Sequence, residues 1–221
     1  MPIVIAIIDY RAGNLTSVKL ALETVGVQGE ITRSPERIRA AERVIFPGVG
    51  AAGAAMRSLA ELGLVGVIRE VAAAGTPFLG ICLGTQIVFE FSEEDGGTDC
   101  IGLVPGRVRL FTPANRLDKV PQMGWNSVRQ VRPHPVFRGI EDGSEFYFVH
   151  SYYPAPADPA YVLGETEYAG ARFASAVGKA NLVATQFHPE KSGRAGLRLL
   201  ENFCRWQPEA VAEAEAEPRR H

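Results

Sequence analysis

The chain has 221 residues, of which 46% are apolar, and its formal net charge at pH 7 is −2. This length and composition allow one large domain with a full core, and the balanced charge gives no reason to expect nucleic acid as a partner. No apolar stretch approaches the roughly 20 residues that span a bilayer, and the opening "MPIVIAIIDY" lacks the basic start of a signal peptide. Three cysteines without a CxxC pair argue against a disulfide framework or a zinc site, and they fit a reducing cytoplasm.

The first half of the chain alternates buried strands with amphipathic helices. Asn14 is placed to cap the first helix, and Gly26 is placed to end it. The expected order is strand 3–8, a helix over 15–25, strand 43–46, helices 51–62 and 64–74, strand 76–81 and helix 85–91. Strands and helices in alternation predict a doubly wound α/β sheet.

Beyond about residue 100 the pattern changes to short strand-like segments with few helices between them. The segments are "RVRLF", "GWNSVRQV", "EFYFVHSYY", "YVLGETEY", "RFASAVG" and "LVATQF". They predict antiparallel strands that extend the sheet, and a last helix over 193–206 closes the fold. We therefore expect one α/β domain over 1–206, with a mostly parallel central sheet flanked by helices and extended by antiparallel strands. Residues 207–221 are rich in alanine and glutamate and predict a solvated, disordered tail.

Cys82 stands in "LGICLGTQ", where an apolar strand gives way to a helical pattern. Its flanking glycines, Gly80 and Gly84, match the G-x-nucleophile-x-G turn, which lifts the central side chain above the sheet edge. A helix N-terminus at this point favours the thiolate, which is the species that attacks a carbonyl carbon, and it aims the N–H of Leu83 at a developing oxyanion. The same five residues also fit a small buried cysteine that only fills a corner.

A cysteine nucleophile needs a base, and His188 is the strongest candidate among the four histidines. The segment "QFHPEKS" places Glu190 two residues after His188, across a turn set by Pro189. A carboxylate at this spacing can hold the imidazole in one tautomer, as the third member of a catalytic triad does. The spacing alone fits ordinary polar groups at a strand end equally well. The other histidines lie in a proline-rich loop, after a β-like run and in the tail: His134, His150 and His221.

The segment "GICLGTQ" with the distant "HPE" resembles the class I, triad-type glutamine amidotransferases, which have a flavodoxin-like fold. Five further segments are similar to the glutaminase subunits of imidazole glycerol phosphate synthase, an enzyme of histidine biosynthesis: "DYRAGNL", "FPGVG", "PQMGWN", "YFVHSYY" and "FASAVGKANLVATQFHPEKS". The resemblance covers residues 3 to 206. The Cys and "HPE" motifs are specific to the superfamily, whereas "MGWN" and "YFVHSY" select the subfamily.

This resemblance implies the hydrolysis of glutamine to glutamate and ammonia, without a metal or another cofactor. Cys82 would attack the side-chain amide, His188 would protonate the departing ammonia and then activate water, and Glu190 would orient His188. The N–H groups of Leu83 and of Val49 or Gly50 would hold the oxyanion. The implied substrate contacts are Gly50, Gln86, Glu94, Ser151 and Tyr152. Glu94 lies in the acidic turn "SEEDGG" and also fits a solvated side chain.

The family's partner is a (β/α)8-barrel cyclase that receives the ammonia, so the resemblance implies a cytoplasmic heterodimer without nucleic acid or membrane. Residues that adjoin the site motifs and suit a docking face are Asn14, Met123, Trp125, Tyr147 and Lys191. The resemblance also implies that the free subunit is nearly inactive until the cyclase and its nucleotide complete the oxyanion hole. Two glycines around Val49 would allow a peptide to flip there at low steric cost.

Two features depart from the family pattern, namely the long approach "FTPANRLDKVPQMGWN" and the acidic tail. Three other functions stay open at this point. The chain could serve a different synthase, such as that of anthranilate, guanylate or pyridoxal phosphate. It could be a non-catalytic scaffold, although a scaffold needs no triad, or a cysteine peptidase, which would need a groove for extended chains.

Overall fold

The computed structural model describes residues 5–115 and 117–208. The greater part of the predicted tail, residues 209–221, lies outside them. The order of the main sheet is β2-β1-β3-β4-β14-β13-β12-β9, and its first five strands are parallel whereas the last three are antiparallel. These strands are β1 Ile5–Ile8, β2 Gly29–Thr32, β3 Arg43–Gly48, β4 Phe78–Cys82, β9 Arg129–Gln130, β12 Val162–Tyr168, β13 Ala171–Lys179 and β14 Leu182–Thr185.

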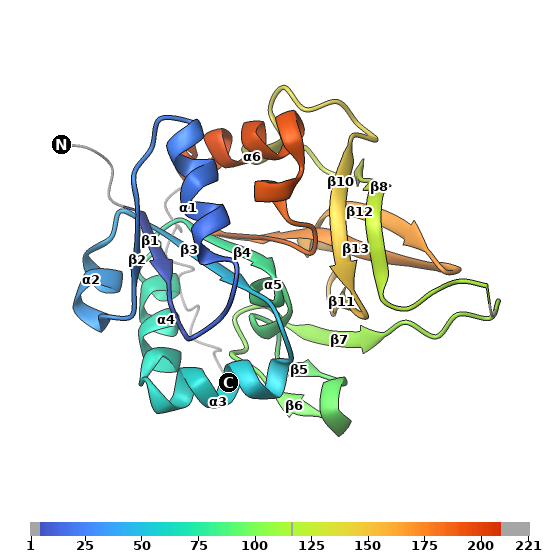
Figure 1. Ribbon diagram of the computed structural model, residues 1–221, viewed down its shortest axis with the longest axis horizontal. Helices are drawn as coiled ribbons and strands as arrows, with labels where there is room; N and C mark the ends of the chain where they lie inside the picture. Colours follow the sequence, from blue (N-terminus) through green and yellow to red (C-terminus); the bar gives the residue numbers. More distant parts are fainter. Residues whose placement is uncertain (1–4, 116, 209–221) are drawn as a thin grey trace, which may run out of the picture.

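Helices cover both faces of this sheet (Figure 1). On one face, α1 and α6 pack against each other; on the other, α3, α4 and α5 share one apolar cluster. The α-helices are α1 Leu15–Thr24, α2 Pro35–Ala40, α3 Ala52–Glu61, α4 Leu64–Ala73, α5 Leu83–Ile87 and α6 Gly193–Arg205. The short 3-10 helices are η1 Glu94–Gly96, η2 Pro135–Phe137, η3 Pro159–Tyr161 and η4 Pro189–Lys191. The apolar strands β1, β3 and β4 are buried throughout, because helices cover both of their faces.

Two smaller sheets lie beside the main sheet, and one of them contacts it through β11 and β13. One pairs β10 with β8, and the other has the order β11-β7-β5-β6. Their bounds are β5 Phe91–Ser92, β6 Thr98–Asp99, β7 Gly106–Leu110, β8 Gln122–Ser127, β10 Glu145–His150 and β11 Tyr152–Pro156. Figure 1 shows the β8–β10 pair at the opposite end of the molecule from β2.

The predicted fold class is confirmed, and the differences are local. The hydrophobic pattern does not predict β2 and α2, which are only four and six residues long. The predicted helix over 85–91 is shorter, since Phe91 and Ser92 pair with β7 as strand β5. The strand-like segments after residue 100 are confirmed as strands, but β7, β8, β10 and β11 belong to the smaller sheets. The expectation that "LVATQF" is an antiparallel extension is wrong on one side, because β14 pairs with β4 in parallel and only with β13 antiparallel.

The expectation that the Asn14 side chain caps α1 is wrong. Asn14 does precede the helix, but its backbone is left-handed, with φ of 69°, and its side chain accepts no hydrogen bond from the helix. A capping side chain needs an extended backbone that aims its oxygen at the first turn. In this conformation the side chain of Asn14 is available for another partner.

No helix within residues 5–115 and 117–208 is long and apolar enough to cross a membrane.

Candidate functional site

The candidate site lies where the carboxyl ends of three neighbouring parallel strands meet. Strand β4 lies between β3 and β14, and Gly48 at the end of β3 is the register partner of Cys82 at the end of β4. On the other side, Thr185 ends β14 opposite Ile81. Because the strands run in the same direction, the segments that follow each of them emerge at one edge. The sheet therefore brings together three sequence motifs that are far apart in the chain.

Cys82 occupies a strained turn between β4 and α5, as the G-x-C-x-G pattern predicts. Its φ and ψ are 54° and −109°, a conformation that costs a non-glycine residue of order 1–3 kcal/mol. Gly84 makes this turn possible, since a Cβ at that position would lie 1.8 Å from the carbonyl oxygen of Phe46. Gln186 Nε2 lies 3.8 Å from Cys82 Sγ, and Sγ lies 3.9 Å from the Val149 carbonyl oxygen.

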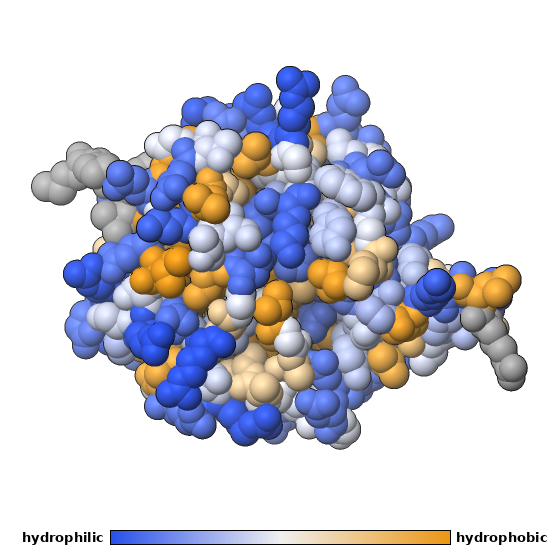
Figure 2. All heavy atoms as spheres, viewed as in Figure 1, coloured by the Kyte–Doolittle hydropathy of each residue, from blue (hydrophilic) through white to orange (hydrophobic). Residues whose placement is uncertain are grey.

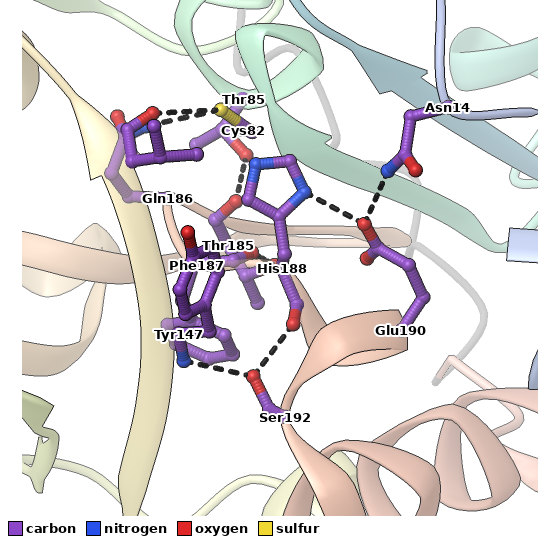
Figure 3. Close-up of polar contacts among 11 residues, drawn as sticks. Asn14, Cys82, Thr85, Tyr147, Thr185, Gln186, Phe187, His188, Glu190 and Ser192 are labelled. Carbon is purple, nitrogen blue, oxygen red and sulfur yellow. Dashed lines mark hydrogen bonds and ion pairs between the residues drawn. The ribbon is translucent and has the colours of Figure 1, made fainter. Parts of the chain in front are cut away.

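His188 and Glu190 form a buried pair next to Cys82 (Figure 3). His188 Nδ1 lies 2.7 Å from Glu190 Oε1, and the two side chains are 1% and 0% exposed. Burial lowers the pKa of His188, but the neighbouring Cys82 and Glu190 outweigh this effect and raise that pKa from 6.5 to about 10. The imidazole is therefore protonated at neutral pH. Figure 3 shows its ring between Cys82 and Glu190, and Nε2 has no hydrogen-bond partner among the described residues.

Further hydrogen bonds hold His188 and Glu190 in place. Asn14 Nδ2 donates to Glu190 Oε1 at 2.6 Å, so that one carboxylate oxygen binds two donors. Ser192 Oγ donates to the His188 carbonyl at 2.6 Å and accepts from the Tyr147 N–H at 3.0 Å. No sequence motif pointed to Ser192. A serine four residues after a candidate base is a weak signal, because serines are common at the start of helices.

A cavity of about 290 Å³ opens beside Cys82, and every residue predicted for the oxyanion or the substrate lines it. Those residues are Val49, Gly50, Leu83, Gln86, Glu94, Ser151 and Tyr152; Pro121, Val149 and His150 line it as well. His188 is not among the lining residues and lies behind Cys82. A hollow of about 710 Å³ lies beside α6, but none of the predicted site residues lines it. The smaller cavity is the candidate site because of the residues that line it, although the hollow beside α6 is larger.

Two of the lining residues are held by hydrogen bonds that fix their orientation. Gln86 Nε2 donates to the Tyr152 carbonyl at 2.9 Å and to Gln186 Oε1 at 3.0 Å. Glu94 Oε2 accepts the N–H of Ala52 at 2.6 Å. Burial raises the pKa of Glu94, although the hydrogen bond from Ala52 opposes the effect. Glu94 is thus partly buried at the cavity and is not the solvated acidic side chain that the sequence also allowed.

Gln186 lies at the candidate site, although no sequence motif pointed to it. Its amide lies between Cys82 and Gln86, so it links Cys82 to a residue that lines the cavity. The one sequence feature that could have indicated Gln186 is its position two residues before His188, in "TQFHPE". A glutamine at the end of an apolar strand fits many structural roles, so the signal was too general to use.

His150 is a structural histidine. Its ring packs against three phenylalanines, with centroids 5.3 Å from Phe111, 5.6 Å from Phe148 and 5.4 Å from Phe173. Nδ1 lies 2.7 Å from the Tyr152 carbonyl, which fixes Nδ1 as the protonated nitrogen. Burial lowers the pKa of His150 to about 4, so the imidazole is neutral at pH 7.

Four of the five residues predicted for a docking face gather around the β8–β10 pair. Trp125 and Tyr147 are register partners with ring centroids 6.2 Å apart, and Lys191 Nζ lies 5.9 Å from the Tyr147 ring centre. Met123 and Trp125 are 67% and 55% exposed. Figure 2 shows a few hydrophobic residues along the loop that Figure 1 draws before β8, interspersed with hydrophilic ones as elsewhere on this face. Asn14 instead contacts Glu190.

Within the described ranges, no group of three or more His, Cys, Asp or Glu side chains is placed to hold a metal ion.

Solved structures share this fold at low sequence identity. "Crystal structure of glutamine amidotransferase" superposes with a TM-score of 0.70 at 16% identity and covers 91% of this chain and 97% of that one. "Structure of PurLQS from Thermotoga maritima" gives a TM-score of 0.69 at 19% identity and covers 93% and 99%. A buried Cys–His–Glu cluster at the carboxyl edge of this sheet, beside a small cavity, is an arrangement that can cleave an amide by nucleophilic attack. Fold and site together define an α/β protein with a Cys–His–Glu site of the kind that cleaves amides.

Comparison with sequence relatives shows to which family the chain belongs. The family model "Glutamine amidotransferase class-I" matches residues 6–206. Two proteins named "Imidazole glycerol phosphate synthase subunit HisH" are 51% identical over 212 residues, from Nitratidesulfovibrio vulgaris, and 53% identical over 199 residues, from Moorella thermoacetica. The matches cover 94% and 90% of this chain, and 98% and 93% of the relatives. The chain belongs to the class-I glutamine amidotransferase family, in the group of imidazole glycerol phosphate synthase HisH subunits.

Proposed function

We propose that the chain is the glutaminase subunit of imidazole glycerol phosphate synthase in histidine biosynthesis, and that residues 1–206 form its amidotransferase unit. It hydrolyses glutamine to glutamate and ammonia, and it passes the ammonia to a cyclase subunit. The observation that carries the chemistry is the buried pair of His188 and Glu190, with Nδ1 and Oε1 2.7 Å apart, directly behind Cys82. Relatives of the same name that match at about 50% identity over nearly the full chain support the pathway.

In the first half-reaction the sulfur of Cys82 attacks the side-chain amide carbon of glutamine. A C–S bond forms, and the carbonyl electrons move onto oxygen, where the N–H groups of Leu83 and of Val49 or Gly50 hold the charge. His188, which is protonated at neutral pH, gives its Nε2 proton to the leaving nitrogen. The C–N bond then breaks, and ammonia departs from a glutamyl thioester.

In the second half-reaction water replaces the sulfur. The neutral His188 takes a proton from the water, the oxygen attacks the thioester carbon, and the C–S bond breaks to give glutamate and Cys82. Glu190 accepts the hydrogen bond of His188 Nδ1 throughout and thereby keeps Nε2 toward the reacting atoms. No metal or cofactor takes part in this scheme.

Substrate recognition follows from the charges of an amino acid. Glu94 pairs with the α-ammonium group, and its partial burial strengthens that pairing. Gln86, Ser151, Tyr152 and the backbone at Gly50 provide the remaining polar contacts around the α-carboxylate and the side-chain amide. The cavity of about 290 Å³ lies at the small end of ligand sites, which suits one amino acid.

The proposed partner is a (β/α)8-barrel cyclase, which forms a cytoplasmic heterodimer with this chain. Its docking face is the exposed surface formed by Met123, Trp125, Tyr147 and Lys191, a group in which aromatic and methionine side chains predominate. The cyclase with bound nucleotide completes the oxyanion hole by reorienting a peptide next to Val49. This coupling keeps the free subunit nearly inactive, so that ammonia forms only when an acceptor is present.

A glutaminase assay tests the proposal. Wild type and Cys82→Ala are each assayed alone, with the cyclase, and with the cyclase and its nucleotide. We expect turnover only in the wild-type complex with nucleotide. Activity that survives in Cys82→Ala would exclude the mechanism, and equal activity of the isolated chain would exclude the coupling. If a different synthase subunit co-purifies with the chain and restores activity, the assigned pathway is wrong.

A further inference from the structure

The hydroxyl of Tyr10 is buried at the active-site edge of the sheet and has no role in the scheme above. Tyr10 follows β1, is 2% exposed, and packs its ring against Phe46 of β3, with centroids 5.3 Å apart. Its Oη has no hydrogen-bond partner among the described residues. Buried tyrosine hydroxyls usually find a partner, because an unpaired one loses its hydrogen bonds to water without compensation. An unpaired hydroxyl at this position therefore requires an explanation.

The position of the hydroxyl is fixed by its closest neighbours. A Cβ built on Gly48 would lie only 2.0 Å from Tyr10 Oη, 3.0 Å from Leu83 Cβ and 3.2 Å from the Gly84 nitrogen. The hydroxyl therefore lies against the α-carbon of Gly48, next to the turn that carries Cys82. Gly48 is both the register partner of Cys82 and the residue before Val49, which lines the cavity. Only glycine leaves room for the hydroxyl at position 48.

The hydroxyl is a permanent donor. Burial and the charge of the nearby Cys82 both raise the pKa of Tyr10, so the phenol keeps its proton at every pH at which the enzyme works. Packing against Phe46 holds the ring, so little side-chain entropy remains to be lost when the hydroxyl forms a bond.

The segment beside this donor is the one that has to move in the proposed mechanism. Val49 is 39% exposed although it follows a fully buried strand, so its side chain is not part of the core. A rotation there brings the carbonyls of residues 47–49 into new positions around a donor that so far lacks an acceptor.

We propose that Tyr10 is a positioning residue for the oxyanion segment: in the glutamine-bound complex its hydroxyl donates a hydrogen bond to a backbone carbonyl of residues 47–49. That bond holds the rearranged segment and keeps its N–H groups aimed at the oxyanion. The inference rests on the proposed function and adds a residue to it. Tyr10 acts only through the backbone of its neighbours and does not touch the substrate.

If Tyr10 served only to pack the core, loss of its hydroxyl would not lower glutamine turnover. Replacing a buried, unpartnered hydroxyl with hydrogen removes an unsatisfied group and is neutral or stabilising for the fold. Tyr10→Phe therefore separates the two roles, because it keeps the ring against Phe46 and deletes only the oxygen. Tyr161→Phe is a matched control, since Tyr161 packs against the same apolar cluster but does not line the cavity.

The experiment measures glutamine turnover by the complex with cyclase and nucleotide, together with the thermal midpoint of each variant. For Tyr10→Phe we expect kcat to fall about tenfold, with KM within twofold of wild type and a thermal midpoint equal to or above wild type. Tyr161→Phe should match wild type in kcat. Wild-type kcat in Tyr10→Phe, or a loss of kcat that comes with a lower thermal midpoint, overturns the inference while the proposed function stands. An inactive wild-type complex overturns both.

Discussion

Asn14 and Glu190 are 176 positions apart in the chain, yet Asn14 Nδ2 donates to Glu190 Oε1 at 2.6 Å. The same oxygen binds His188 Nδ1 at 2.7 Å. The second carboxylate oxygen, Oε2, has no partner among the described residues. Asn14 thus selects which oxygen of Glu190 faces the imidazole, and the loop after β1 takes part in orienting His188.

Replacing Asn14 with alanine should lower glutaminase kcat in the complex about tenfold and leave KM nearly unchanged. Loss of one hydrogen bond to a charged group corresponds to about 1.5 kcal/mol, and Glu190 would then hold His188 less firmly. Asn14→Asp should be worse, because it places a second negative charge beside Glu190. Asn202→Ala is the matched control, since Asn202 Nδ2 donates to carbonyls at Val136 and Arg138. Equal kcat values for wild type and both Asn14 variants would contradict this role.

The second prediction concerns the close approach at Gly84. Gly84→Ala should lower the free energy of unfolding by about 3 kcal/mol, because its Cβ would lie 1.8 Å from the Phe46 carbonyl oxygen, and backbone cannot move aside cheaply. Gly66→Ala is the control. It lies inside α4 with nothing within 4 Å of the added carbon, and it should raise the free energy by roughly 0.5–1 kcal/mol. Urea unfolding followed by circular dichroism measures both, and a mild effect at Gly84 would show that the turn can relax.

Sequence patterns predicted β1, β3 and β4 and pointed to Cys82, His188 and Glu190 as a candidate site, because these features are local. They did not predict β2, nor the parallel pairing of β14 with β4. The glycines around Cys82 and the "HPE" spacing each lie within a few residues, and hydrophobic runs mark β1, β3 and β4. The Asn14–Glu190 bond and the bridge through Gln186 are contacts between strand ends, so only the sheet order brings them together. Periodicity likewise predicts strands but not which strand each one pairs with. For this reason the β8–β10 pair was not expected as a separate sheet.

The third prediction concerns the charge of Glu94. Glu94→Gln keeps an oxygen that can accept the Ala52 N–H but removes the negative charge at the cavity. If that charge pairs with the α-ammonium group, KM for glutamine should rise 10- to 100-fold, with kcat within about threefold of wild type. Glu93→Gln is a close control, since Glu93 Oε2 accepts from Leu110 and the residue does not line the cavity. An unchanged KM in Glu94→Gln would remove Glu94 from the substrate site.

The fourth prediction tests the docking face. Trp125→Ala should raise the dissociation constant for the cyclase about 30-fold, since a well-packed interfacial tryptophan contributes about 2 kcal/mol. The free energy of unfolding of the isolated Trp125→Ala subunit should change little, because the Trp125 side chain is 55% exposed. Leu20→Ala, at an equally exposed leucine on α1, should bind the cyclase as wild type does. Isothermal titration calorimetry gives both constants, and equal affinities of the two variants would place the interface elsewhere.

The last prediction concerns acid stability and His150. Its pKa is about 4 in the folded chain, below the ordinary value of 6.5, so between these values the unfolded chain binds a proton that the folded chain does not. Stability must therefore fall as the pH drops below about 6.5, by about 2 kcal/mol at pH 5. His150→Asn keeps a donor for the Tyr152 carbonyl but cannot titrate, so its unfolding free energy should change less between pH 7 and pH 5. Burial also lowers the pKa of His134 to about 4, but that residue is present in both proteins, so the difference between their slopes isolates His150. Parallel slopes in urea titrations at the two pH values would mean that the His150 imidazole is protonated in the folded chain.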